Sequence, residues 1–216
     1  MTQNGGAFIT LEGIDGCGKS TQAEYLREWL AVFCGLPAIR TFEPGGWSGG
    51  ALLRRLLLDE KNAIAPDTEL LLFLADRSAH LDSVISPALS EGKWVVCERY
   101  TDSTLAYQSF GRGIGLDRIE SFLNVCKFRE PDLTIFLDIE VSLAEARLRE
   151  RGKLDRIESS EGGGFMSKVA HGYRELAKRH VERIVTVDAR GDALSVGVRV
   201  REAVTRRFGV AETRQS

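Results

Sequence analysis

The chain is poor in cysteine and has no long hydrophobic run. Its four cysteines, Cys17, Cys34, Cys97 and Cys126, are widely spaced and form no Cys-x-x-Cys pair. This pattern favours reduced thiols over a disulfide framework or a zinc site, so we expect a cytoplasmic protein. No apolar stretch reaches the length that crosses a bilayer, and no basic region precedes a long apolar one near the N-terminus. We therefore expect no membrane partner.

The chain also lacks an excess of charge of either sign. Its 29 Lys and Arg residues against 31 Asp and Glu residues give a formal net charge of −2. Without an overall basic field we expect no nucleic-acid partner, and any anionic ligand must be held by local positive groups. The 43% hydrophobic fraction is enough for one packed core over 216 residues.

Short apolar runs alternate with amphipathic stretches along the whole chain. The expected strands are 7–11, 38–42, 94–97, 133–137 and 184–187. The expected helices are 19–33, 51–58, 68–90, 117–126, 142–150, 165–181 and 192–208. This alternation predicts a doubly wound α/β fold with a five-stranded parallel sheet, in which ligands bind at the carboxyl ends of the strands. We expect one domain over residues 1–216, with a polar tail at 209–216.

The segment after the first expected strand is a phosphate-binding loop. Residues 13–20 read GIDGCGKS, which matches G-x-x-x-x-G-K-[ST] between a strand and a helix. The glycines let backbone N–H groups form an anion nest at a helix N-terminus. We expect Lys19 to reach the β- and γ-phosphates of ATP and the Ser20 hydroxyl to bind Mg²⁺. The expected ATP site within this segment is Gly13, Ile14, Asp15, Gly16, Cys17, Gly18, Lys19, Ser20 and Thr21.

The loop identifies a phosphoryl donor and leaves the acceptor open. A GTPase normally carries an Asn-Lys-x-Asp segment, which this sequence does not contain. A nucleotide or small-metabolite kinase needs a second set of arginines, and Arg54, Arg77 and Arg99 are candidates because a guanidinium binds phosphate bidentately and stays charged when buried. Two alternatives stay open: a non-catalytic module that uses ATP as a switch, and a kinase for another nucleoside monophosphate.

Together with the loop, five further motifs resemble those of thymidylate kinases, in the same order. They are FEPGG (42–46), LADR (74–77), ERYTDSTLAYQ (98–108), PDLTIFLD (131–138) and RGKLDRIE (151–158). The resemblance covers about residues 7–190. It implies a P-loop nucleoside monophosphate kinase that phosphorylates dTMP to dTDP with ATP and Mg²⁺, by direct in-line transfer without a covalent intermediate. It also implies a homodimer.

The resemblance assigns roles around the thymine base and the sugar. Phe73 would stack on the thymine ring, and Arg77 would donate a hydrogen bond to its carbonyl edge. Thr104 and Gln108 would complete the base contacts, while Tyr107 would crowd the sugar C2′ and disfavour ribonucleotides. An aromatic face suits a flat base, and a buried arginine donates while staying ionised.

The resemblance likewise assigns roles around the acceptor phosphate. Arg99 and Arg54 would hold this phosphate, next to Pro44. Asp15 would accept a hydrogen bond from the 3′-hydroxyl, which explains a carboxylate in an anion-binding loop. Glu98 would orient its neighbours, the metal ion among them.

A basic segment at about 149–164 is expected to form a small mobile lid. Taken alone, its charges fit a solvated helix end. The segment resembles the RGELDRIE-like lids of bacterial thymidylate kinases whose phosphate loop lacks a basic residue, and this loop has Gly16 where the other subclass carries Arg. We therefore expect Arg151 and Arg156, with Arg149 next, to stabilise the transferring phosphoryl group. The expected catalytic residues are Lys19, Glu98, Arg99, Arg151 and Arg156, and Arg149 joins the ATP site.

Two positions depart from the family pattern. Phe42 stands where many relatives have Arg in T-R-E-P-G-G, and we expect it to remove one polar contact near the acceptor. Glu98 replaces the commoner Asp, and its extra methylene is expected to keep the charge while changing its reach. Neither change touches Lys19 or Arg99, so we expect an active enzyme.

Overall fold

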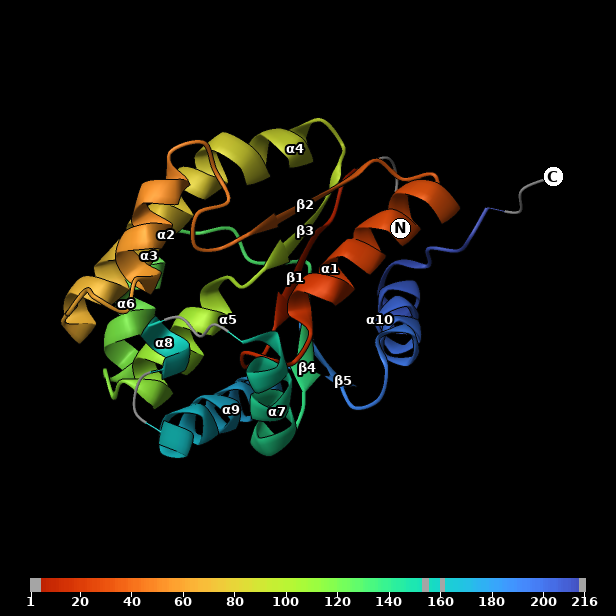
Figure 1. Cartoon of the computed structure of the whole chain (residues 1–216). Helices are drawn as coiled ribbons and strands as arrows, with labels where there is room; N and C mark the ends of the chain where they lie inside the picture. Colours follow the sequence, from red (N-terminus) through yellow and green to blue (C-terminus); the bar gives the residue numbers. More distant parts are fainter. Residues whose placement is uncertain (1–4, 153–155, 160–161, 214–216) are drawn as a thin grey trace.

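The fold is built on one parallel sheet with helices on both faces, as Figure 1 shows. This computed structural model describes residues 5–152, 156–159 and 162–213. The strands are β1 (Phe8–Glu12), β2 (Ala38–Phe42), β3 (Trp94–Glu98), β4 (Leu133–Asp138) and β5 (Ile184–Asp188). They pair in the order β2-β3-β1-β4-β5, and every pairing is parallel. The predicted doubly wound, five-stranded sheet is confirmed.

The central strands were predictable because they are buried on both faces. All five residues of β1 and of β3 are buried. A strand covered by helices on both sides needs apolar side chains in nearly every position, and it therefore appears in the sequence as a continuous apolar run. The edge strand β2 is more exposed, and only Thr41 of its five residues is buried.

The helices largely follow the expected ranges. They are α1 (Lys19–Glu28), α2 (Gly50–Leu58), α3 (Pro66–His80), α4 (Ser86–Ser90), α5 (Thr101–Thr104), α6 (Leu116–Cys126), α7 (Val141–Arg151), α8 (Arg156–Ser159), α9 (Gly162–Arg179) and α10 (Ala193–Phe208). Three π-helical segments continue them: η1 (Trp29–Phe33) after α1, η2 (Leu81–Ile85) between α3 and α4, and η3 (Leu105–Gly111) after α5. The expected helix at 68–90 is therefore α3, η2 and α4 in succession.

The helical segment formed by α5 and η3 was not predicted from the sequence. Residues 102–108 are all buried, so the segment has no polar face and no amphipathic period. It also opens with Thr, Asp, Ser and Thr, which compete with helix formation through their side-chain hydrogen bonds. Packing against α9 and α6 stabilises it in place of local propensity.

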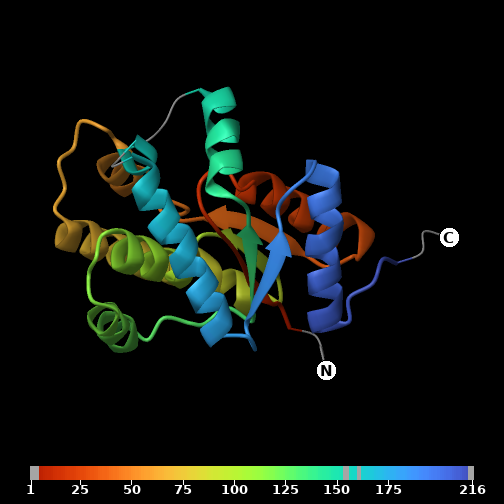
Figure 2. The same ribbon diagram turned by 90° about the horizontal axis from the view of Figure 1, so that it is seen from below.

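The helices form two layers around the sheet. Helices α1 and α10 pack together on one face, where α1 contacts β1, β2 and β3 and α10 contacts β4 and β5. Helix α9 packs on β4 and β5 from the other face, and Figure 2 shows α9 and α10 on opposite sides of these two strands. The core therefore lies on both sides of the sheet, and the carboxyl ends of the strands stay open toward the phosphate loop.

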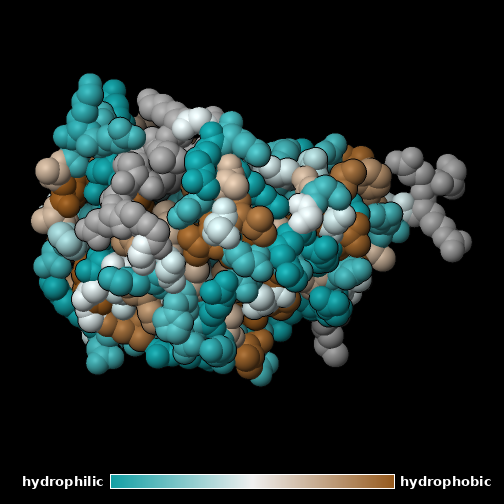
Figure 3. Space-filling model, turned by 60° about the horizontal axis from the view of Figure 1, so that its bottom comes forward, coloured by the Kyte–Doolittle hydropathy of each residue, from teal (hydrophilic) through white to brown (hydrophobic). Residues whose placement is uncertain are grey.

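The polarity of the surface agrees with the mixture of charged and hydrophobic residues in the sequence. The face in Figure 3 is largely hydrophilic, with hydrophobic residues scattered among polar ones. Within the described ranges, no helix combines the length and the apolar character that a membrane span requires. All four cysteines carry free thiols, as the spacing predicted.

Candidate active site

A cleft of about 1110 Å³ opens where the strands end. It is bounded by the phosphate loop after β1, the start of α1, the segment after β2, and helices α2, α3, α5 and α7. Because the carboxyl ends of parallel strands share one edge of the sheet, residues far apart in the sequence meet here. All nine residues expected at dTMP line this cleft, namely Asp15, Pro44, Arg54, Phe73, Arg77, Arg99, Thr104, Tyr107 and Gln108. From the expected ATP site, Asp15, Gly16, Gly18, Lys19, Ser20 and Thr21 also line it.

The side chain of Lys19 stabilises the conformation of the phosphate loop by hydrogen bonds to the loop's own backbone. Nζ of Lys19 donates to the carbonyl oxygens of Gly13 and Ile14, at 2.9 Å each, and the side chain is 8% exposed. Ile14 and Cys17 are buried and anchor the loop in the core, so these two do not line the cleft. The side of the loop that lines the cleft therefore carries Asp15, Gly16, Gly18 and Lys19.

Gly16 marks a close approach between the loop and α7. Its φ is +82°, and a Cβ atom there would lie 2.3 Å from the carbonyl oxygen of Ala144. Real Cβ atoms do not come that close to a backbone atom, so no side chain fits at this position without displacing α7. The loop of this chain therefore has no room for the arginine that the other subclass carries.

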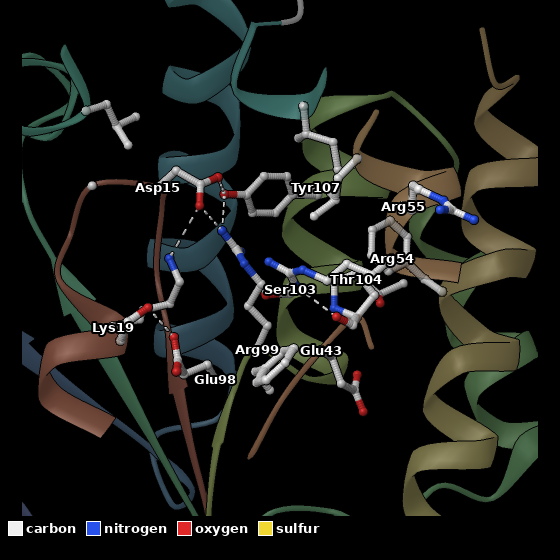
Figure 4. Close-up of a pocket in the computed structure, with 18 of the residues that line it drawn as sticks. Asp15, Lys19, Glu43, Arg54, Arg55, Glu98, Arg99, Ser103, Thr104 and Tyr107 are labelled. Atoms are coloured by element: carbon white, nitrogen blue, oxygen red, sulfur yellow. Dashed lines mark hydrogen bonds and ion pairs between the residues drawn. The ribbon is translucent and has the colours of Figure 1, made fainter. Parts of the chain in front are cut away.

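Asp15 sits at the centre of a polar cluster, shown in Figure 4. One carboxylate oxygen forms an ion pair with Arg99, and the other accepts a hydrogen bond of 2.8 Å from the Tyr107 hydroxyl. The Lys19 ammonium lies 3.8 Å from Oδ1 of Asp15, the oxygen that pairs with Arg99. Burial alone would raise the pKa of Asp15, but the charges of Arg99 and Lys19 and the Tyr107 hydrogen bond outweigh it and hold this pKa well below its usual range. Asp15 is therefore ionised at neutral pH.

Arg99 owes its position to an unusual backbone turn. Its φ is +65°, a left-handed conformation that non-glycine residues seldom adopt, and it follows directly after β3. The next turn is fixed by the fully buried carboxylate of Glu12, which accepts from the Tyr100 N–H at 2.7 Å and from the Ser103 hydroxyl at 2.6 Å. Burial and the nearby Asp102 carboxylate raise the pKa of Glu12. Glu12 was not predicted from the sequence as a residue of the site, although it immediately precedes the loop.

Ser20 and Glu98 join the loop to the end of β3. The Ser20 hydroxyl donates to Oε2 of Glu98 at 2.5 Å. Because the Ser20 hydroxyl donates its proton to this hydrogen bond, the lone pairs of the Ser20 oxygen stay available to a hard cation, which prefers oxygen ligands. Among the described residues, no group of three or more His, Cys, Asp or Glu side chains could hold a metal by itself. The donor set thus fits a cation that takes most of its ligands from nucleotide phosphates and water.

Arg77, on α3, is a buried side chain in the wall of the cleft. It is 1% exposed, and it donates to Glu43 at 2.8 Å, to the Thr104 hydroxyl at 2.9 Å and to the Tyr100 carbonyl at 2.9 Å. These bonds use three of its five N–H donors, so two are left for a ligand or for further contacts. Its guanidinium also lies 5.0 Å from the centre of the Tyr100 ring.

Arg54 and Phe42 form a second contact in the wall of the cleft. The Arg54 guanidinium lies 5.1 Å from the centre of the Phe42 ring, a cation–π contact, and it donates to the Pro44 carbonyl at 2.8 Å. Phe42, which departs from the family pattern, therefore supports an arginine of the site through its ring.

The lid residues lie in different environments. Arg156, on α8, donates to Glu69 at 2.5 Å and to the Leu57 carbonyl at 2.7 Å, and it is not among the residues that line the cleft. Arg149, near the end of α7, is exposed, and the side chain of Arg151 lies outside the described part of the chain, as do residues 153–155 and 160–161 of the expected lid.

Glu69, a buried carboxylate that was not predicted from the sequence, connects α8 to η3. Besides Arg156 it accepts from Gln108 at 2.9 Å and from Arg112 at 3.2 Å. Burial raises the pKa of Glu69, but hydrogen bonds from Arg112, Arg156 and Gln108 lower it by more. The pKa of Glu69 therefore lies below its usual value. Its role depends on partners 39, 43 and 87 residues away, which no local pattern indicates.

Comparisons with known proteins agree with this geometry. The family model "Thymidylate kinase" matches residues 11–196. The thymidylate kinase of Alkalilimnicola ehrlichii is 48% identical over 187 residues, 85% of either chain, and that of Nostoc punctiforme is 45% identical over 85% of this chain and 88% of its own. A crystal structure of thymidylate kinase from Ehrlichia chaffeensis superposes with a TM-score of 0.76 at 30% identity, covering 93% of this chain and 99% of that one.

Proposed function

The chain belongs to the thymidylate kinase family and is a nucleoside monophosphate kinase, and we propose that it transfers the γ-phosphoryl group of ATP to dTMP. One observation carries this proposal: the phosphate loop with Lys19 and the complete set of expected acceptor residues line one cleft. A two-substrate kinase needs both anion sites within reach of each other, whereas a nucleotide switch needs only the first.

The donor half of the cleft would take ATP with Mg²⁺. Gly16, Gly18 and their neighbours would give backbone N–H groups to the phosphates, and Lys19 would leave its loop carbonyls for the β- and γ-phosphates. Ser20 would be the protein ligand of Mg²⁺, oriented by Glu98. Held there, Mg²⁺ would supply positive charge that offsets the charge of the nucleotide phosphates.

The acceptor half would take dTMP. Phe73 offers a ring for the base, Arg77 two spare donors for its carbonyl edge, and Tyr107 a ring beside the sugar. Arg99 and Arg54 would hold the phosphate. Because one methyl group in an apolar pocket is worth only about 1–3 kcal/mol, discrimination against dUMP should be modest.

The remaining positive charge would come from the lid. Ala144 occupies the space beside Gly16, so the loop cannot carry an arginine at that position, and α7 includes Arg149 and Arg151 at its end. Arginines at the transferring phosphoryl group contribute about 10³–10⁵ in rate in related reactions. We propose that Arg149, Arg151 and Arg156 act here when the lid, about residues 149–164 of the single domain, closes and excludes water.

Arg156 offers a test of the lid. If it acts on the phosphoryl group, Arg156→Ala lowers kcat far more than it raises KM for dTMP. Arg156 also contacts Glu69, which accepts a hydrogen bond from the expected base contact Gln108, so a purely structural role of Arg156 would change the KM for dTMP instead. A raised KM for dTMP with unchanged kcat would show that Arg156 only docks the lid and would remove it from the catalytic set.

The acceptor is tested by one coupled assay of ADP release with dTMP, dUMP, dCMP, dGMP, AMP and UMP side by side. We expect dTMP to give the highest turnover and ATP consumption to require an acceptor. Turnover with dTMP no greater than with the others would refute the acceptor assignment, and acceptor-independent consumption would favour the switch. In addition, Asp15→Asn should weaken dTMP binding and leave ATP binding nearly intact if Asp15 binds the 3′-hydroxyl.

Two further properties stay predictions, the first from the family resemblance and the second from the cysteines. We propose a homodimer, which sedimentation equilibrium would test against the 23.9 kDa mass of one chain. We also propose a cytoplasmic location, because four free thiols are typical of a reducing compartment.

A further inference from the structure

Arg40 contacts the site from the edge strand β2, and no role assigned so far accounts for it. Its Nε and Nη2 donate to Oε1 of Glu98 at 2.8 and 2.5 Å, and its Nη1 donates to Glu24 at 3.3 Å. The other oxygen of Glu98 accepts from Ser20. The two oxygens of Glu98 are thus divided between Arg40 and the residue that would bind the metal ion.

The geometry of the strand relates Arg40 to the departure at Phe42. Side chains alternate along a strand, so residues 40 and 42 share one face of β2. In the β2–β3 register Phe42 lies opposite Glu98, and Arg40 lies opposite Val96, which makes the Arg40–Glu98 contact a diagonal one. An arginine at position 42 would face Glu98 directly. This chain has its arginine two residues earlier, and position 42 holds the ring on which Arg54 stacks.

The departure at Glu98 fits the same arrangement. The carboxylate must meet Ser20 on α1 and also Arg40, which approaches from two residues away on the neighbouring strand. Aspartate is one methylene shorter and would not span the same two partners from this backbone position. The departures at 42 and 98 are therefore consistent with each other and with the presence of Arg40.

We propose that Arg40 is a positioning residue that holds Glu98 against Ser20 and thereby replaces an arginine at position 42. This inference rests on the proposed use of a nucleotide with a divalent cation. With Oε1 fixed by Arg40, Oε2 of Glu98 accepts the hydrogen bond from the Ser20 hydroxyl, and the lone pairs of the Ser20 oxygen stay available to the cation. Without Arg40 this carboxylate loses both donors to Oε1, and the orientation of Ser20 is lost with it.

The test is nucleotide binding with and without the cation. A fluorescent ATP analogue is titrated against the full chain and against Arg40→Met, with excess Mg²⁺ and again in EDTA. We expect the variant to bind the Mg²⁺ complex roughly three- to tenfold more weakly, the loss typical of charge-assisted hydrogen bonds in a partly exposed site. Binding in EDTA should not change, because Arg40 acts through the Ser20 oxygen that meets the cation.

Arg27 provides a matched control. It pairs with the same Glu24 as Arg40 and its side chain has the same exposure of 32%, but its described contacts do not include Glu98. Arg27→Met should bind the nucleotide as the unmodified chain does, in both conditions. A loss as large as that of Arg40→Met would overturn the proposal, because it would place the effect at Glu24.

A rescue experiment separates positioning from a structural role. The double variant Arg40→Met, Phe42→Arg moves the guanidinium to the position directly opposite Glu98, and it should recover most of the lost Mg²⁺-nucleotide affinity. No recovery would overturn the replacement, and a loss in Arg40→Met that is equal with Mg²⁺ and with EDTA would overturn the action through Ser20. These binding measurements do not use dTMP. A failure of the proposed dTMP kinase activity would therefore leave the role of Arg40 intact, and a failure of the Arg40 proposal would leave the dTMP assignment intact.

Discussion

Replacing Gly16 with alanine would force the phosphate loop and α7 into collision. The new Cβ would lie 2.3 Å from the Ala144 carbonyl oxygen and 2.9 Å from its carbonyl carbon, where ordinary contacts begin at 3.4 Å. Relief requires a shift of about 1 Å in the backbone of the loop or of α7. Overpacking of this kind costs about 1–3 kcal/mol. The left-handed φ of +82° adds about 1–2 kcal/mol for any residue with a Cβ.

Gly18 is the control that separates the two costs. Its φ is +99°, but nothing lies within 4 Å of a Cβ built there, so Gly18→Ala incurs the backbone strain without the collision. We expect Gly16→Ala to be less stable than Gly18→Ala by about 1–3 kcal/mol in urea unfolding. At roughly 2–4 °C per kcal/mol for a chain of this size, the two Tm values should differ by several degrees. Equal stabilities would refute the close approach of α7 to the loop.

The other predictions concern the ion pairs of the cleft. Arg77→Met leaves the buried Glu43 carboxylate without the guanidinium that pairs with it, and it should destabilise the fold by about 3–5 kcal/mol. Arg77→Lys, which keeps a positive charge, should lose less. A change below about 1 kcal/mol in urea unfolding of Arg77→Met would contradict the buried pair. For Asp15 the folded pKa lies below its ordinary 3.8, so its ionised form stabilises the fold at neutral pH, and this contribution is lost as the pH falls below 3.8 toward the folded pKa. Urea unfolding from pH 7 to pH 3 should therefore show Asp15→Asn less stable than the unmodified chain at neutral pH, with a gap that is constant above about pH 5 and begins to narrow below 3.8. A gap that stays constant down to pH 3 would disprove the linkage.

What the sequence predicts well in this protein is local. The phosphate loop is one contiguous motif between a strand and a helix, and its conformation follows from its glycines and its flanking elements. The strands were found because burial on both faces leaves apolar runs. In contrast, the segment of α5 and η3 is stabilised by its surroundings, and its own residues give no periodic signal.

The contacts that complete the site are distant in sequence. Arg40 meets Glu98 across 58 residues, and Glu12 meets Ser103 across 91. A charged residue in a strand or at its end is ordinarily a solvated charge, and nothing adjacent to Arg40 or Glu12 distinguishes it from one. Only the strand order, which places β3 between β2 and β1, brings these groups together.

The pairing of Arg99 with Asp15 has a consequence for the turnover of the site. The Arg99 guanidinium is already paired with the Asp15 carboxylate. If Arg99 binds the acceptor phosphate as proposed, that phosphate would meet a positive charge that is already partly offset, so the net gain on binding would be smaller than at an unpaired arginine. Asp15 would remain beside the arginine when the product leaves. Such a site would give up affinity and in return release its product more easily.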